Sequence, residues 1–242
     1  MLDTILLLAG PMEQPVLTAT FKGHNPGLTV LPVANLAELL GIEPEIFRRA
    51  RLVAYASPII VPPQILDQLG YGAYNFHPGP PDYPGLAPAQ FAIYHDAANF
   101  GATAHLIVEK VDAGPIVGVE LFPTPPGISV IELEWLAYRH MAHIFWELAK
   151  ALATQAEPLP RLPIHWSGEK STRRRYAAMC NLAPDISRDE LHRRIRAFGG
   201  NSFGLGLTLE LHGAQFVLAT PSPPPNLVET AIAANGPASA AD

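Results

Sequence analysis

The 242-residue chain contains a single cysteine, Cys180. One cysteine cannot form a disulfide within the chain, and without a second one nearby it does not indicate a thiolate metal site. Long apolar runs are also missing, because none reaches the roughly 20 residues that a membrane-spanning helix needs. The start, Met1-Leu2-Asp3, lacks the basic residues of a signal peptide. These absences predict a cytoplasmic protein with no membrane-embedded part.

Basic residues are outnumbered, with 16 Lys and Arg against 22 Asp and Glu and a net charge of -6. This balance argues against nucleic acid as the main partner, because phosphate binding needs clustered Lys and Arg. The sequence has one basic cluster, which centres on Arg173, Arg174 and Arg175. Its composition is typical of a solvated linker, and phosphate binding is the alternative.

The composition otherwise fits a folded protein, since 48% of the residues are hydrophobic. A chain of this length can bury a sizeable core and suits one domain plus an appendage. The proline-rich segment 158–163 marks a boundary. We predict a main domain at 1–157, a linker and truncated C-terminal subdomain at 158–220, and a disordered tail at 221–242.

Strand and helix patterns alternate along the main domain, which predicts an α/β fold: a mostly parallel sheet with helices on both faces. The appendage predicts a small, partial α+β unit with a helix that ends at Phe198 and a hairpin that turns near Gly213. Trp135 and Trp146, in the longest helical pattern, are expected to pack in the core. The strand candidates are 4–9, 28–33, 51–55, 73–77 and 119–122, and the helix candidates are 36–40, 44–49, 63–69, 87–96 and 130–152.

Three polar residues stand out in the centre of the chain. Asn75 and His77 lie two apart on the strand 73–77, so their side chains share one face at its carboxyl end, where parallel sheets bind ligands. Asp112 follows in a turn that continues with Gly114 and Pro115. These side chains suit acyl transfer. The carboxamide can donate a hydrogen bond, the imidazole can hold or release a proton, and the carboxylate can orient the imidazole.

Four short motifs occur in order around these residues. They are Asn75-Phe76-His77-Pro78, Pro81-Asp82-Tyr83-Pro84-Gly85, Gly101-Ala102-Thr103-Ala104-His105 and Asp112-Ala113-Gly114-Pro115. Their order and spacing resemble the folate-dependent formyltransferases, a family that includes the methionyl-tRNA, glycinamide ribonucleotide and sugar-nucleotide enzymes. Four ordered motifs over about seventy residues are a far more specific signal than any one of them.

The resemblance implies a Rossmann-like formyltransferase domain at 1–157 and 10-formyltetrahydrofolate as cosubstrate, with no metal. It also implies three groups of site residues. The catalytic residues would be Asn75, His77 and Asp112; the folate-binding residues would be Pro58, Ile59, Ile60, Val108, Glu109, Lys110 and Val111; and Thr103, His105 and Gly114 would support Asp112 and its turn. His140 and His143 lie three apart on a helical pattern but lack a third ligand at a fitting spacing, so no metal site is expected.

The sequence also departs from the family. The turn after the first strand contains Pro11 and Glu13, which argues against a phosphate-binding loop and so against a ribosyl phosphate substrate. The loop after His77 is one residue shorter than in relatives, yet Asn75, His77 and Asp112 are still expected to converge, because a loop deletion leaves the strand ends in place.

Three functions remain open at this point. The first is transfer of a formyl group to the amine of a small acceptor, for which an amino-sugar nucleotide is a candidate. The second is hydrolysis of the same cosubstrate to release formate, and the third is non-catalytic folate binding. The acidic balance and the incomplete C-terminal subdomain predict that tRNA is not a partner, and a homo-oligomer is left open.

Overall fold

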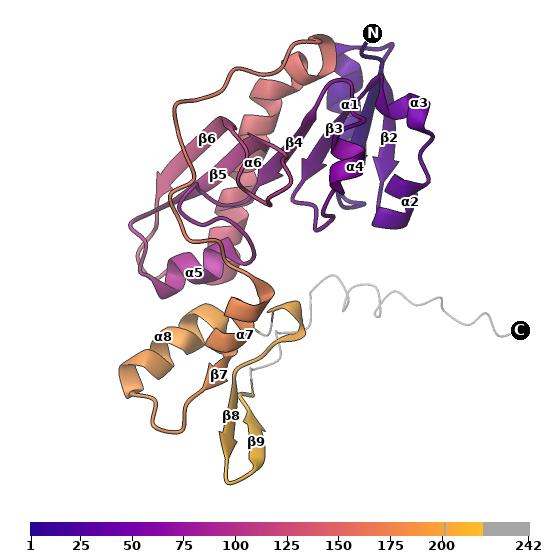
Figure 1. Cartoon of the computed structure of the whole chain (residues 1–242). Helices are drawn as coiled ribbons and strands as arrows, with labels where there is room; N and C mark the ends of the chain where they lie inside the picture. The colour runs from indigo at the N-terminus through magenta and orange to yellow at the C-terminus, as the bar shows by residue number, and fades with distance from the viewer. Residues whose placement is uncertain (201, 220–242) are drawn as a thin grey trace, which may run out of the picture.

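The computed structural model describes residues 1–200 and 202–219; the tail expected at 221–242 lies outside the described residues. A six-stranded sheet in the order β2-β1-β3-β4-β5-β6 forms the main domain (Figure 1). The first four strands in this order are parallel, and β5 and β6 run antiparallel to their neighbours. The strands are β1 (Thr4–Leu8), β2 (Thr29–Val33), β3 (Ala50–Tyr55), β4 (Ala73–His77), β5 (Asn99–Leu106) and β6 (Ile116–Pro123).

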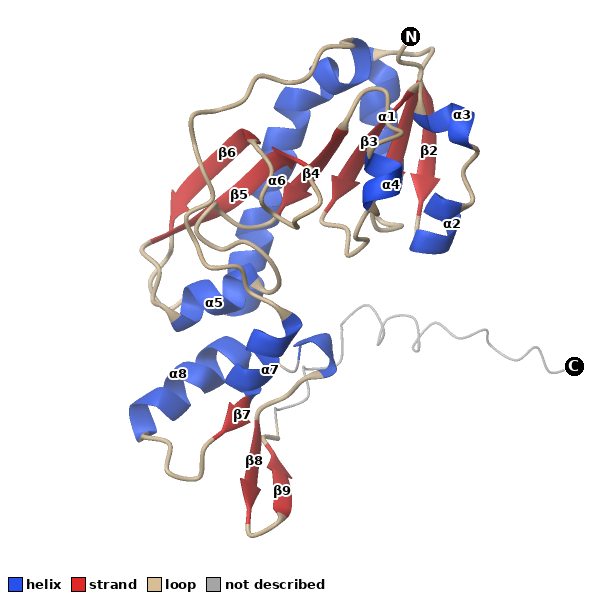
Figure 2. Cartoon of the chain, viewed as in Figure 1, coloured by secondary structure: helices blue, strands red, loops and turns tan. Residues whose placement is uncertain are grey.

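Helices cover both faces of the sheet, as the α/β prediction requires (Figure 2). In β1, Ile5 and Leu7 pack on the face covered by α1 and α6, whereas Leu6 and Leu8 pack on the face covered by α2, α3 and α4. This two-residue alternation is the ordinary geometry of a strand buried on both faces. The helices are α1 (Gln14–His24), α2 (Leu36–Leu40), α3 (Pro44–Phe47), α4 (Pro63–Leu66), α5 (Pro88–Tyr94) and α6 (Val130–Thr154). The predicted fold class is confirmed.

Helix α6 is the longest helix, and it begins at a capping box formed by Ser129 and Glu132. Its buried stripe contacts the sheet through residues that include Met141, Ile144 and Phe145. The expectation that Trp135 and Trp146 pack in the core is wrong, since they are 68% and 57% exposed. Both lie off the stripe, because only one side of an amphipathic helix can face a sheet.

The basic cluster is not the flexible linker that its composition indicated. Helix α7 (Arg173–Cys180) begins here, because the side chain of Thr172 accepts a hydrogen bond from the backbone N–H of Arg175. Arg173 donates to the carbonyl of Phe203, and Arg175 pairs with Glu169 at 3.0 Å. Helix α1 was not predicted either; its sequence contains Pro15, which lies in the first turn, where a missing N–H costs nothing.

The C-terminal subdomain adds α8 (Arg188–Phe198), a short 3-10 turn (Ser202–Gly204) and a small sheet of β7 (Asn181–Leu182), β8 (Thr208–Leu211) and β9 (Ala214–Val217). The rings of Phe91 on α5 and Phe198 on α8 meet edge-to-face with centroids 5.4 Å apart. Tyr176 and Cys180 on α7 are buried in the same cluster. The subdomain therefore shares a core with α5, while the domain boundary near residue 158 stays a prediction. Among the described helices, none combines the length and the apolarity needed to cross a membrane.

Arg51 joins the sheet to the end of α6. Its side chain is fully buried at the start of β3, where Nε donates to the carbonyl of Tyr71 (3.0 Å) and Nη1 to that of Leu152 (2.7 Å). The last carbonyls of a helix have no partner within the helix, so Arg51 satisfies groups that would otherwise be buried without a hydrogen bond.

We expect Arg51→Leu to lower the free energy of unfolding by about 3 kcal/mol, because it leaves two or more buried carbonyls unpaired. Urea denaturation followed by circular dichroism measures this. Arg49→Leu is the matched control, since the Arg49 side chain is 54% exposed and pairs with Asp3 only at 3.5 Å. Equal stability of the two variants would show that Arg51 does not hold the end of α6.

Candidate active site

The pairing of β4 with β5 places four polar side chains together. Asn75 lies opposite His105, and His77 lies opposite Thr103, in an antiparallel register. Because side chains alternate along each strand, these four share the face turned away from α6, while Ala102 and Ala104 pack toward it. His77, Thr103 and His105 are buried, and Asn75 is partly exposed.

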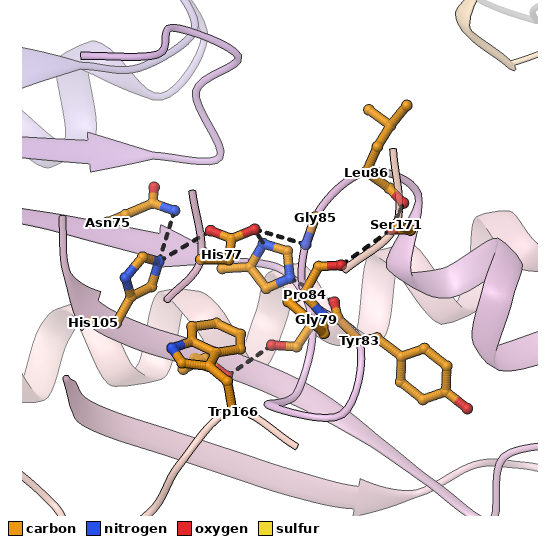
Figure 3. A network of polar contacts seen from close by, with 12 residues as sticks. Asn75, His77, Gly79, Tyr83, Pro84, Gly85, Leu86, His105, Trp166 and Ser171 are labelled. Atoms are coloured by element: carbon orange, nitrogen blue, oxygen red, sulfur yellow. Dashed lines mark hydrogen bonds and ion pairs between the residues drawn. The ribbon is translucent and has the colours of Figure 1, made fainter. Parts of the chain in front are cut away.

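Asp112 reaches this group from the turn between β5 and β6. Its Oδ1 lies 3.2 Å from Nε2 of His105, and its Oδ2 lies 3.6 Å from Nδ1 of His77 (Figure 3). The backbone N–H of Gly85 donates to Oδ2 at 2.8 Å. Asp112 itself has a φ of +47°, a left-handed backbone that is uncommon for a residue with a side chain and that tends to occur at functional sites. The convergence expected of Asn75, His77 and Asp112 is present.

The charges in the group follow from burial and contacts. Burial alone would raise the pKa of Asp112, but the positive charge that the imidazoles of His77 and His105 carry when protonated, together with the Gly85 N–H, holds this pKa below its usual value, so Asp112 is a carboxylate at neutral pH. Burial lowers the pKa of His77, and the opposing effect of Asp112 does not restore it, so this imidazole is neutral at pH 7. Nε2 of His77 donates to the carbonyl of Tyr83 (3.1 Å), which leaves the lone pair of Nδ1 facing Asp112.

Asn75 and His105 form the second half of the group. Nδ1 of His105 donates to the carbonyl of Leu106 at 2.8 Å, so in the neutral ring Nε2 is an acceptor. Nε2 lies 3.2 Å from both the amide nitrogen of Asn75 and Oδ1 of Asp112, so it accepts from Asn75 in the neutral ring and donates to Asp112 in the protonated ring. An amide nitrogen carries two hydrogens, so one N–H of Asn75 remains for a ligand at the partly exposed side of the site.

The loop after His77 fits closely around the ring. A Cβ on Gly79 would lie 2.7 Å from Nε2 of His77, and a Cβ on Gly85, whose φ is +92°, would lie 2.1 Å from the carbonyl oxygen of Ser171. Only glycine is tolerated at such distances. Thr103, expected to support Asp112, instead donates to the carbonyl of Gly79 at 2.8 Å and so holds this loop. His105 contacts Asp112 directly.

Trp166 belongs to the site, although the sequence analysis did not single it out. Its ring meets His105 and His77 edge-to-face, with centroids 5.0 and 5.9 Å away. Its Nε1–H donates to the carbonyl of Gly114 at 2.9 Å, two residues after Asp112. Trp166 lies outside the four motifs, and a lone tryptophan after a proline-rich segment is no signal for a site.

The residues expected to bind folate lie in two loops. Pro58, Ile59 and Ile60 follow β3, and Ile60 is 66% exposed. The second loop, after β5, contains Val108, Glu109, Lys110 and Val111, of which the first three are exposed. Ile59 and Ile107 pack against the same core cluster, so the two loops adjoin one apolar region. Such a region fits a flat heteroaromatic ring, and the binding roles stay predictions.

A group of potential metal ligands lies elsewhere, between β6 and α6. Glu120 accepts a hydrogen bond from Nδ1 of His140 (2.7 Å) and pairs with His143. Ligand atoms of Glu120, His143 and Glu147 lie within 4.8 Å of one another. The sequence pattern missed Glu120, because it lies on a strand that precedes the helix. Ion pairs account for this arrangement, and the expected absence of a metal stays a prediction.

Comparison with known proteins gives a consistent result. The model of the formyl transferase family matches residues 48–134. Methionyl-tRNA formyltransferase of Thermotoga neapolitana is 26% identical over 227 residues, which cover 81% of this chain and 68% of the relative. Alignments with the first curated relatives span between 46% and 68% of their length.

Two solved structures have a similar fold. A 4-N formyltransferase from Francisella tularensis superposes with a TM-score of 0.67 at 16% identity, over 90% of this chain and 97% of that one. An N-formyltransferase from Helicobacter canadensis, in complex with folinic acid and dTDP-3-aminofucose, gives a TM-score of 0.61 at 15% identity, over 88% and 85% of the two chains. The match over residues 48–134 and the methionyl-tRNA formyltransferase relatives show that this chain is similar to the formyl transferase family, and the two solved structures share its fold.

Proposed function

We propose that the protein transfers a formyl group from 10-formyltetrahydrofolate to the amine of a small acceptor, with an amino-sugar nucleotide as the leading candidate, in the cytoplasm. One observation carries the proposal. The carboxylate of Asp112 lies between two buried imidazoles, and the amide of Asn75 is on the same face of the sheet. This group contains both a donor for a developing oxyanion and an acceptor for the proton of an amine.

The chemistry requires both functions. Attack of an amine on the formyl carbon produces a tetrahedral species with a negative oxygen, and the amine then loses a proton. Collapse of this species breaks the bond between the formyl carbon and the folate nitrogen, which takes up a proton and leaves as tetrahydrofolate. The free N–H of Asn75 donates to the oxygen. The lone pair of Nδ1 of His77 faces Asp112, so a proton that reaches this pair forms an imidazolium beside a carboxylate. Nε2 of His105 lies 3.2 Å from both the amide nitrogen of Asn75 and Oδ1 of Asp112, so this imidazole keeps the two side chains close together.

The proposed substrates rest on separate observations. Exposed apolar side chains at Ile60 and Val108 support folate binding next to the site. The Helicobacter canadensis structure described above holds a folate and an amino-sugar nucleotide, which supports an acceptor of this class. The relatives named above are formyltransferases, and no observation favours the hydrolase alternative.

An acceptor screen tests the proposal. We expect 10-formyltetrahydrofolate to be consumed only when an amino-sugar nucleotide or another small amine is added, with the formylated amine detected by mass spectrometry. Initiator methionyl-tRNA is the matched control acceptor, and we expect neither its formylation nor its retardation in a gel at physiological salt, given the net charge of -6. Steady formate release without any amine, or formylation of the tRNA alone, would contradict the proposal.

The carboxylate of Asp112 gives a second prediction. Asp112→Asn should fold and bind folate normally but lose about 100- to 10,000-fold in kcat, because a neutral amide does not stabilise the imidazolium that forms when His77 takes up the proton. Single-turnover assays and calorimetric titration with folinic acid separate the two effects. Asp67→Asn, at an exposed position after α4, is the matched control and should keep full activity. A fully active Asp112→Asn enzyme would disprove the mechanism.

The neutral state of His77 predicts how stability depends on pH. The folded-state pKa of His77 is lowered by burial, whereas an unfolded histidine titrates near about 6.5. Below that pH the unfolded chain binds a proton that the folded chain does not, so stability falls as the pH falls.

Between about pH 6.5 and pH 5, we expect the free energy of unfolding of His77→Gln to depend less steeply on pH than that of the wild type, by up to about 1.4 kcal/mol per pH unit. Urea denaturation at a series of pH values measures it. His24→Gln, at the exposed end of α1, is the control and should keep the steeper slope. If the free energy of unfolding changes equally with pH in the wild type and in His77→Gln, the folded-state pKa of His77 is not lowered.

A further inference from the structure

A segment that follows α6 crosses the site and is fixed at both ends. We call residues 162–171 the strap. The backbone N–H of Leu162 donates to the carbonyl of Ile116 at the start of β6 (2.8 Å). At the other end, the N–H of Ser171 donates to the carbonyl of Pro84 (2.9 Å), in the loop after His77. In between, Ser167 donates to the side chain of Asp82. The strap therefore joins the two segments that flank the site.

Trp166 is the strap residue that faces the site. Its ring is in edge-to-face contact with both His77 and His105, an arrangement that aromatic pairs prefer. Its Nε1–H fixes the carbonyl of Gly114, two residues after Asp112. The same side chain thus contacts the two imidazoles and the turn that carries the carboxylate.

We propose that Trp166 is a positioning residue for the formyl transfer: it holds His77, His105 and the Asp112 turn in register and shields this side of the three groups from water. The inference rests on the proposed function and extends it to a segment outside the four motifs. Asp112 needs such support, because its turn has a left-handed backbone and no regular secondary structure.

The physical effect has two parts. The indole replaces water beside the histidines, which strengthens the interactions of Asp112 in a medium of lower dielectric constant. The hydrogen bond to Gly114 sets the distance between Asp112 and His105, which is 3.2 Å. A shift of about 1 Å in a catalytic group can cost about 100-fold in rate. The contribution of Trp166 is therefore expected in kcat rather than in KM.

The activity test compares kcat and KM of variants in which one tryptophan is replaced. Trp166→Ala should lower kcat by up to about 100-fold and change its pH profile, with a small effect on KM for folate. Trp166→Phe keeps an aromatic ring but loses the N–H that bonds to Gly114, so its kcat should lie between that of the wild type and that of Trp166→Ala. Trp135→Phe, at an exposed position on α6, is the matched control and should behave as the wild type. Wild-type kcat and pH profile in Trp166→Ala would overturn the proposal.

A fluorescence test needs neither turnover nor an acceptor. The chain has three tryptophans, so the Trp135→Phe/Trp146→Phe variant leaves Trp166 as the sole emitter. Each imidazole that contacts the indole contributes to the polarity around it, so adding His105→Gln or His77→Gln should shift the emission maximum of this variant at neutral pH. An emission maximum that neither histidine substitution moves would show that the contacts do not exist in solution.

The two tests separate the proposals. If no amine accepts a formyl group, the proposed function fails, while the fluorescence of the single-tryptophan variant still decides whether Trp166 contacts the histidines. If transfer is observed but Trp166→Ala remains folded and fully active, the proposed function stands and the positioning role is wrong. Thermal unfolding of Trp166→Ala and Trp166→Phe separates a loss of kcat from a loss of folded protein.

Discussion

The site depends on one buried negative charge, the carboxylate of Asp112. A buried carboxylate is costly unless it is paired and hydrogen-bonded; here the backbone N–H of Gly85 donates to it, and Nε2 of His105 and Nδ1 of His77 lie 3.2 and 3.6 Å from its oxygens. Each of these partners comes from a different part of the chain. The position of the charge therefore constrains β4, β5 and the loop after His77 at once.

The alternation of side chains in the sheet separates structural from chemical residues. On β5, Ala102 and Ala104 pack against the face covered by α6, whereas Thr103 and His105 point into the site. A bulge between β5 and β6 shifts the register at His105, just where the chain must turn back toward Asp112. The core on both sides of the sheet thus holds the polar side chains of the site on the one face turned away from α6.

The C-terminal subdomain contributes to the site indirectly. Ser171 bonds to the loop that carries Gly85, and Arg175 lies over the ring of Phe91 on α5. Helices α7 and α8 share a core with α5, so the strap connects the end of the main sheet to a packed helical region at its other end. Contacts from the strap therefore complete the packing of the loop after His77.

The sequence by itself determined the elements whose information is local. Alternating apolar patterns predicted β4 at its observed bounds and the α/β fold, and the two-residue spacing of Asn75 and His77 placed them on one face. The ordered motifs added Asp112 and His105. Helix α7 was missed, because its start depends on a single cap by Thr172 in a charged segment.

Only the tertiary structure decided the features that depend on contacts between distant residues. Trp135 and Trp146 are exposed because the sheet covers a single stripe of α6, and Trp166, the third tryptophan, lies against His77 and His105 because the strap is fixed at both ends. The pairing of Arg51 with the end of α6 spans about a hundred residues. Side-chain chemistry can be read along the chain, but which side chains become neighbours is set by packing in three dimensions.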